Sequence, residues 1–259
     1  MNFELSYEER GAVAYVRLER AAKRNALTGA MLERLSEIFA GVSARRDLRA
    51  AVLSGDGGDF CAGTDIAELE SLDEARARRK AVQGQRVCDA IESCGVPVIA
   101  AVQGAAAGGG CELALACHLR VAAKGARFSL PETRLGLIPA YGGTQRLAHA
   151  VGRGRALAAM LAGEEVCADE ALRLGLVNRV VAADSLMCEA EALARAVVET
   201  SAPLAVRACL EAVTRGSRLA LDEGLKLEAE LFASLFSTED VREGTRAFLE
   251  KRSPEFKGR

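Results

Sequence analysis

A glycine run beside a glutamate is the part of this 259-residue chain best suited to chemistry. The stretch from Gly104 to Arg120 reads GAAAGGGCELALACHLR, and Glu112 follows the third consecutive glycine by two positions. It continues the apolar segment VPVIAAVQG, so the pattern predicts a buried strand, a glycine turn and a helix. The first N–H groups of a helix have no partner inside it, and glycine lets a ligand oxygen approach them. Gly109 is therefore a candidate oxyanion-hole donor.

A second glycine-containing loop, GDFCAGTDI, also follows a segment with the pattern of a buried strand. If the two loops face each other, the N–H of Thr64 can supply a second donor to the same oxygen. Each preorganised amide aimed at a developing oxyanion contributes about 10²–10³ in rate. The two loops together therefore predict a site that polarises a carbonyl group.

Two carboxylates accompany these loops. Glu112 lies in the first turn of the predicted helix, and Glu132 follows a proline in the segment FSLPETRLGLIPAYGGTQRL. Two carboxyl groups across a dry pocket push their pKa values apart, which leaves one acid and one base, as the addition of water to a polarised double bond requires. Each residue also has a structural alternative. These are close packing for the glycines, a favourable charge at a helix start for Glu112, and a loop salt bridge for Glu132.

Other chemistries lack their sequence signals. The chain has no GxGxxG, GxxxxGK or GxSxG motif, which argues against dinucleotide, P-loop and serine-hydrolase sites. No metal site is expected, because His118 and His149 have no ligands at metal spacing and the eight cysteines form no CxxC pair. The net charge of −2 argues against nucleic acid as the main partner.

Composition and the first residues indicate a compartment. The chain is 50% hydrophobic, which is enough for one large or two small globular domains. The segment MNFELSYEER lacks the apolar core of a secretion signal, and no uncharged apolar stretch reaches the ~18 residues of a membrane span. Most cysteines have Ala/Leu-rich surroundings, where cysteine behaves as a small hydrophobe. We therefore expect a cytoplasmic protein that is not associated with a membrane.

Strand and helix patterns alternate along the first half of the chain. Two short strands are predicted on either side of Gly11, and the segment from Leu27 has helical spacing, with Thr28 placed to cap the helix. Further strands at RAAVLSG, VPVIAAVQG and LRVAA, with a polar helix over 72–93, predict an α/β arrangement with parallel strands. From about Gly142, helical segments follow one another, broken only by LVNRVV. One domain with a helical extension is the expected organisation.

Several segments, in this order, resemble the enoyl-CoA hydratase/isomerase (crotonase) superfamily over almost the whole chain. They are KRNAL, FCAGTDI, PVIAAVQGAAAGGGCELALAC, PETRLGLIP, GGTQRL and STEDVREGTRAFLEKRSPEFKGR. The resemblance implies an α/β fold, a crotonase-type spiral of ββα units with a C-terminal helical layer. It divides the chain into a core over 1–195 and a helical trimerisation region over 196–259. It also implies an acyl-CoA thioester substrate and a homotrimer or homohexamer.

The resemblance assigns roles to individual residues. Thr64 and Gly109 donate their backbone N–H groups to the thioester oxygen. Glu112 activates a water for attack at Cβ and Glu132 delivers a proton to Cα, so the chain resembles a hydratase that reversibly converts a trans-2-enoyl-CoA into the 3-hydroxyacyl-CoA. Coenzyme A belongs to the substrate, and no metal or other cofactor is implied. The candidates for CoA binding are Lys23, Arg24, Ala62, Asp65, Ile66, Phe256 and Lys257, the last two from a neighbouring helix or subunit.

Three positions depart from the family pattern. Ala140 stands where hydratases commonly have glycine close to the water, and Ala67 stands where some relatives direct a lysine at the CoA phosphates. His118 replaces a common aspartate and is expected to be structural. Many relatives with other chemistry lack one or both glutamates, so retention of the pair favours hydration. Enoyl-CoA isomerisation and a non-catalytic acyl-CoA or RNA-binding scaffold are the alternatives, and acyl chain length is left open.

Overall fold

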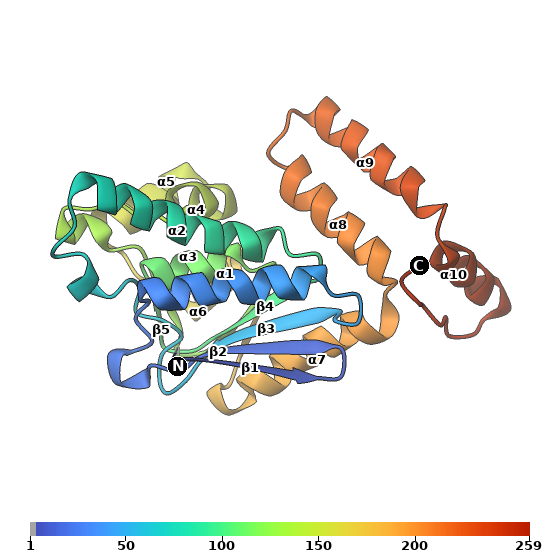
Figure 1. Ribbon diagram of the computed structural model, residues 1–259, viewed down its shortest axis with the longest axis horizontal. Coiled ribbons are helices and arrows are strands. Elements are labelled where there is room, and N and C mark those ends of the chain that lie inside the picture. Colours follow the sequence, from blue (N-terminus) through green and yellow to red (C-terminus); the bar gives the residue numbers. More distant parts are fainter. Residues whose placement is uncertain (1–3) are drawn as a thin grey trace.

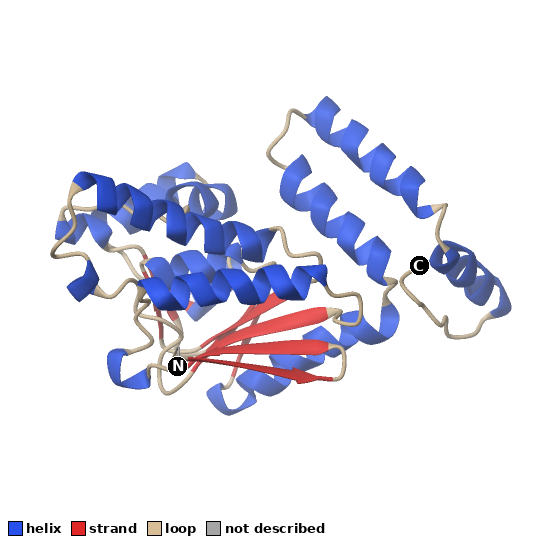
Figure 2. Cartoon of the chain, in the orientation of Figure 1, coloured by secondary structure: helices blue, strands red, loops and turns tan. Residues whose placement is uncertain are grey.

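The main sheet has six strands in a computed structural model that describes residues 4–259 (Figure 2). Its strands are β1 (Leu5–Arg10), β2 (Val13–Leu18), β3 (Ala50–Gly55), β4 (Val98–Val102), β6 (Leu119–Ala123) and β9 (Arg179–Val181). β1 and β2 form an antiparallel hairpin, and the chain turns at Gly11 with a φ of 60°. The other strands run parallel to β2 in the order β2-β3-β4-β6-β9. The predicted parallel α/β arrangement is confirmed.

A second, smaller sheet corrects two expectations. It contains β5 (Ala105–Ala107), β7 (Arg127–Ser129) and β8 (Val166–Cys167) in the order β5-β7-β8. The strand before the glycine run therefore does not lead straight into a helix, because β5 lies between them. The helical segments after Gly142 are also interrupted by β8, in addition to β9. Strands of two or three residues are too short to show an alternating pattern, so the sequence did not reveal them.

The helices differ widely in length. The α-helices are α1 (Gly29–Ala44), α2 (Glu74–Glu92), α3 (Gly109–Ala116), α4 (Gly143–Val151), α5 (Arg153–Leu157), α6 (Ala168–Arg173), α7 (Leu186–Thr200), α8 (Pro203–Gly216), α9 (Leu221–Leu235) and α10 (Glu239–Glu250). Short 3-10 turns are η1 (Ala21–Lys23), η2 (Ile66–Glu68), η3 (Glu132–Leu135) and η5 (Ala183–Ser185), and η4 (Ala158–Ala162) is a π-helical turn. Thr28 caps α1 as expected, because its side chain accepts a hydrogen bond from Met31 N (3.2 Å).

Helices cover both faces of the main sheet (Figure 1). On one face, Leu35 and Phe39 of α1 and Ile91 of α2 belong to the same buried apolar cluster as Leu53 of β3. On the other face, buried residues of α7, including Ala190, form a separate cluster with residues of β2, β3 and β4. A parallel sheet that is buried on both faces needs nearly continuous apolar strands, which explains the alanine- and valine-rich strand sequences.

The last three helices extend from one end of this body. Figure 1 shows α8 and α9 side by side, with α10 beyond them at the end of the molecule opposite β5. Neither α8 nor α9 contains a buried residue, and large apolar side chains such as Phe232 and Phe248 are exposed. The predicted boundary between residues 195 and 196 falls inside α7. Within residues 4–259, no helix combines the length and apolarity needed to cross a bilayer.

Candidate active site

The glycine turn before α3 brings two distant segments together. Gly108 precedes the helix with φ 50° and ψ −126°, a conformation that suits glycine alone. Its N–H donates to the carbonyl of Ser129 (2.9 Å), at the end of β7. A Cβ at Gly108 would lie 3.0 Å from Oε1 of Glu132. The absence of a side chain at this position therefore allows Glu132 to lie against the start of α3.

The two glycine loops face each other, as their sequences suggested. A Cβ at Gly63 would lie 3.4 Å from the amide nitrogen of Gly109, and Gly63 has a φ of 104°. The loop of Gly63 is held by Leu27, whose N–H donates to the Gly63 carbonyl (2.7 Å). No turn or loop hydrogen bond between backbone groups of residues 4–259 uses the N–H of Thr64 or Gly109. Two neighbouring amides of this kind can hold one ligand oxygen.

Asn25 organises the Thr64 loop, a role that is not predicted from the sequence. Its side chain has no exposed surface, and its Oδ1 accepts a hydrogen bond from Arg20 N (2.9 Å). Its Nδ2 lies within hydrogen-bonding distance of the carbonyl oxygens of Asp56 (2.8 Å), Asp59 (2.8 Å) and Phe60 (3.2 Å). One buried amide group therefore fixes the path of the chain from the end of β3 to the oxyanion loop. No periodic pattern marks such a residue in a sequence.

Glu112 is a buried carboxyl with a defined orientation. Its side chain is 1% exposed, and its Oε1 accepts hydrogen bonds from Tyr141 N (2.8 Å) and Gly143 N (2.7 Å). Burial is the main cause that raises the pKa of Glu112 from 4.5 to about 7, and the charge of Glu132 raises it further. The two amides oppose this rise. A carboxyl whose pKa lies near neutrality is suited to exchange a proton with water.

Glu132 is the second carboxyl near the start of α3, and one of its oxygens is unpaired. It is the first residue of η3, and its Oε2 is buried without a hydrogen-bond partner among residues 4–259. Burial raises the pKa of Glu132 as well. The turn is anchored by Thr133, whose Oγ1 donates to the carbonyl of Met160 (2.6 Å). A buried carboxyl oxygen without a protein partner is expected to bind a water or a ligand atom.

The loop before α4 holds Glu112 in place, which is not predicted from the sequence. Only Ala140 was singled out there, and its carbonyl accepts a hydrogen bond from the side chain of Gln85 (2.9 Å). Tyr141 and Gly143 hold Glu112 through their backbone N–H groups. A Cβ at Gly143 would lie 2.8 Å from Cγ of Glu112, so this glycine is needed for the close approach. The consecutive glycines Gly142 and Gly143 are the sequence feature that could have indicated this close approach.

Five of the CoA-binding candidates lie on neighbouring loops. The N–H of Ala62 donates to the carbonyl of Arg24 (2.9 Å), which joins the loop after η1 to the oxyanion loop. Lys23 ends η1, Asp65 caps η2, and Ile66 begins η2 with an exposed side chain. The structure therefore joins the loop that holds Lys23 and Arg24 to the loop that holds Ala62, Asp65 and Ile66.

Two of these charged side chains already have partners. Arg24 forms an ion pair with Asp59 (2.6 Å), and Asp65 forms one with Arg20 (2.6 Å). Ala67, which stands where some relatives have a lysine, donates its N–H to Oδ1 of Asp65 (3.1 Å). Asp65 therefore serves to fix η2, and a phosphate near Arg24 would compete with Asp59.

The remaining two candidates lie elsewhere in the same chain. Lys257 donates its N–H to Asp240 (2.7 Å), and the Phe256 ring lies 3.2 Å from the position of a Cβ at Gly244 in α10. In Figure 1 the C-terminus and α10 are at the end of the molecule opposite β5. Within one chain, Phe256 and Lys257 are therefore far from the other five candidates.

His118 has the structural surroundings that its position suggested. Its Nδ1 accepts a hydrogen bond from Val98 N (2.9 Å), and its Nε2 lies 3.1 Å from the carbonyl of Glu92. Burial lowers the pKa of His118. The neutral ring thus links the end of α2 to the start of β4. Within residues 4–259, no group of three or more His, Cys, Asp or Glu side chains is arranged to hold a metal ion.

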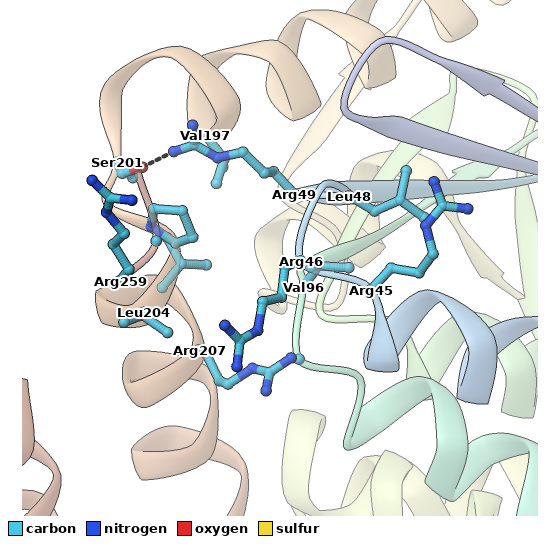
Figure 3. Close-up of a pocket in the computed structure, with 14 residues that line it drawn as sticks. Arg45, Arg46, Leu48, Arg49, Val96, Val197, Ser201, Leu204, Arg207 and Arg259 are labelled. Atoms are coloured by element: carbon cyan, nitrogen blue, oxygen red, sulfur yellow. Dashed lines mark hydrogen bonds between the residues drawn. The ribbon is translucent and has the colours of Figure 1, made fainter. Parts of the chain in front are cut away.

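A separate cavity of about 240 Å³ lies where β3 and β4 begin (Figure 3). Arg49 and Val96, which lie just before these strands, line it, and Ser201 accepts a hydrogen bond from Arg49. Arg46 and Arg207 add positive charge to the same cavity. Ligands of parallel sheets bind at the carboxyl ends of the strands. The glycine loops follow those ends, and the arginine-lined cavity lies at the other end of the sheet.

Comparisons with known proteins give the family relationship of the chain. A sequence model of the family described as enoyl-CoA hydratase/isomerase matches residues 8–259. The chain is 40% identical over 254 residues to a short-chain-enoyl-CoA hydratase of Clostridium acetobutylicum. This alignment covers 97% of each of the two chains. The chain is also 40% identical over 256 residues to a crotonyl-CoA hydratase of Syntrophomonas wolfei, which covers 98% of this chain and 97% of the other.

Similarity extends to the three-dimensional structure. A crystal structure of an enoyl-CoA hydratase from Bacillus anthracis aligns with a TM-score of 0.94 at 36% identity, over 99% of this chain and 100% of the other. The crotonase-type α/β fold expected from the sequence is confirmed. The chain belongs to the enoyl-CoA hydratase/isomerase family.

Proposed function

We propose that the protein is an enoyl-CoA hydratase that adds water reversibly across the 2,3 double bond of a trans-2-enoyl-CoA. The observation that carries this proposal is the buried carboxyl of Glu112 and the partly buried carboxyl of Glu132, whose Oε2 has no partner, beside two facing glycine loops. The relatives named as enoyl-CoA hydratases over nearly the whole chain support the same reaction. The enzyme is accordingly a hydro-lyase.

The carbonyl of the thioester is the group that the loops would polarise. Its oxygen accepts hydrogen bonds from the N–H groups of Thr64 and Gly109, which makes Cβ electrophilic and stabilises the enolate-like transition state. Donors that are already in place act most strongly on charge that develops during the reaction. The Asn25 hydrogen bonds and the close packing at Gly63 support this role, because they hold the first donor beside the second.

The two carboxyls divide the proton transfers between them. Glu112 takes a proton from the water that attacks Cβ, and Glu132 delivers a proton to Cα. The raised pKa of Glu112 suits a general base, and the raised pKa of Glu132 suits a group that must carry a proton. Because no electrons enter or leave the protein, the reaction needs no redox cofactor. Polarisation by amides also needs no metal, and coenzyme A arrives as part of the substrate.

The binding of CoA and the assembly extend this proposal. Lys23, Arg24 and Ile66 lie beside the oxyanion loop, where the CoA portion of an acyl-CoA thioester would extend from the carbonyl. Phe256 and Lys257 would act on the site of a neighbouring subunit. The exposed apolar side chains of α8, α9 and α10 would pack in a homotrimer or a homohexamer built from trimers. We place the enzyme in the cytoplasm, with no nucleic acid or membrane partner.

Hydration of crotonyl-CoA tests the proposal directly. The wild-type protein should remove the absorbance of the conjugated enoyl thioester, and Glu112→Gln and Glu132→Gln should each slow this loss by at least about 10². Glu74→Gln is the matched control, because this carboxyl has a side chain that is 90% exposed. No loss of absorbance with the wild-type protein, on crotonyl-CoA or a longer enoyl-CoA, would refute hydration.

The same variants separate hydration from its closest rival. An enoyl-CoA isomerase moves a proton between two carbons and needs no attacking water, so one carboxyl can suffice. Dependence on only one of the two glutamates, with a 3-enoyl-CoA converted to the 2-enoyl-CoA, would favour isomerisation. A salt-sensitive shift of RNA that survives both substitutions would instead favour the scaffold alternative.

A further inference from the structure

The side chain of Tyr141 fills the space next to the two oxyanion loops. It is 3% exposed, and its hydroxyl accepts a hydrogen bond from Oγ1 of Thr64 (2.8 Å). One edge of its ring, at Cε2, lies 2.9 Å from the position that a Cβ would take at Gly109. The ring therefore packs directly against both residues that carry the proposed oxyanion donors.

Helix α2 makes room for this ring on its other side. A Cβ at Gly84 would overlap Cδ1, Cγ and Cε1 of Tyr141. Gly84 lies in the interior of a 19-residue helix, where glycine weakens the helix relative to alanine. Glycine at this position lowers the stability of the helix but leaves room for the aromatic ring. The packing of α2 against α3 therefore fixes the position of the Tyr141 ring.

The direction of a bound acyl chain follows from the other contacts of Tyr141. Its N–H donates to Oε1 of Glu112 (2.8 Å), so the backbone of Tyr141 forms the wall behind this carboxyl. With the carbonyl oxygen held by Thr64 and Gly109 and with Cβ beside Glu112, the chain beyond Cβ passes this wall. The Tyr141 ring stands on it, between α2 and the start of α3.

We propose that the Tyr141 ring closes the acyl pocket on the side of α2 and limits the substrate to short acyl groups. The inference deepens the proposed function and rests on its acyl-CoA substrate. A ring held between Gly84 and Gly109 has no free space to move into, because protein interiors are close-packed. Tyr141 is in this sense a specificity-determining residue, and its hydroxyl serves to fix the ring to Thr64.

Binding of saturated acyl-CoA thioesters tests this inference without catalysis. Kd is measured by titration calorimetry for butyryl-CoA and decanoyl-CoA with the wild-type protein, Tyr141→Ala, Tyr141→Phe and Tyr7→Ala. We expect Tyr141→Ala to shift the ratio of the two Kd values at least about tenfold in favour of decanoyl-CoA. Tyr141→Phe retains the ring and should keep the wild-type ratio. Tyr7→Ala, on β1, is the matched control and should also keep it.

Two outcomes of this titration would overturn the inference. An unchanged ratio in Tyr141→Ala would overturn the inference, and an equal shift in Tyr141→Phe would do so too, because it would assign the effect to the hydroxyl. If Tyr141→Ala does not fold, the double variant Gly84→Ala/Tyr141→Ala supplies the same comparison with a methyl group in the vacated space. A shifted ratio in a protein that fails to hydrate crotonyl-CoA would keep this inference and refute the proposed reaction.

Discussion

Replacing Glu112 by glutamine should make the protein more stable at alkaline pH while it removes activity. Burial raises the pKa of Glu112 from 4.5 to about 7, so the folded protein binds this proton more tightly than the unfolded chain does. The stability that the protonated carboxyl contributes is complete below about pH 4.5 and is lost as the pH rises through about 7. At about 1.4 kcal/mol per pH unit, ionisation of the buried group costs the folded state about 3 kcal/mol.

Glutamine does not ionise, and its side-chain oxygen can still accept from Tyr141 N and Gly143 N. The free energy of unfolding is measured by urea titration, followed by circular dichroism, from pH 5 to pH 8.5. The difference in the free energy of unfolding between Glu112→Gln and the wild-type protein should rise by about 2 to 3 kcal/mol from pH 5 to pH 8.5, in favour of the variant. Glu74→Gln is the matched control and should change the free energy of unfolding by less than about 0.5 kcal/mol, because its side chain is exposed. The kcat of Glu112→Gln for crotonyl-CoA should fall by about 10²–10⁴.

A difference in stability between Glu112→Gln and the wild-type protein that does not change with pH would refute this reasoning, because the pKa of Glu112 would then be ordinary. The wild-type enzyme gives a second readout. Since a general base must lose its proton before it can act, kcat/KM for hydration should rise with pH through about 7. A profile that is flat between pH 6 and pH 8 would contradict the assignment of Glu112 as the base.

Three further substitutions test the packing that positions the site. Gly108→Ala should lower the free energy of unfolding by about 1–3 kcal/mol and also reduce kcat, because φ at this position is positive and the added Cβ would crowd Glu132. A normal melting temperature with full activity would contradict this. Asn25→Ala should cost about 3 kcal/mol in urea unfolding, because it removes the hydrogen bonds of a fully buried amide to one backbone N–H and three backbone carbonyls. A loss below 1 kcal/mol would count against the organising role. Gly84→Ala should destabilise the wild-type protein by about 1–3 kcal/mol yet stabilise Tyr141→Ala by up to about 1 kcal/mol. The same sign in both backgrounds would show that the ring and the helix glycine are not coupled.

Local signals were sufficient for the parts of the site that lie on one continuous segment. The glycine run before α3 and the first-turn position of Glu112 could be predicted, since strand, turn and helix patterns are read within a few residues. The facing arrangement of the Thr64 and Gly109 loops was a hypothesis from their shared position after buried strands, and the structure confirms that they face each other. The two loops meet because Cys61, just before the Thr64 loop, forms a parallel bridge with Ala106 of β5, just before the glycine run.

Residues that act across the fold gave no such signal. Asn25 and Tyr141 are ordinary residues in loops, and only the path of the chain brings them to the oxyanion loop and to Glu112. The strands β5, β7 and β8 were missed for a related reason, because two or three residues show no period and become strands only through their neighbours. β5 and β7 nevertheless place Gly108 beside Glu132.

The sequence by itself determined the strands of the main sheet, the longer helices, the glycine turn and the two carboxylates, because these depend on residue type and local spacing. The tertiary structure alone decided the pKa of Glu112, the unpaired oxygen of Glu132 and the place of the Tyr141 ring. Each of these depends on which atoms surround a side chain once water has been excluded. Burial and contact are properties of the packed chain, and segments far apart in the sequence create them together.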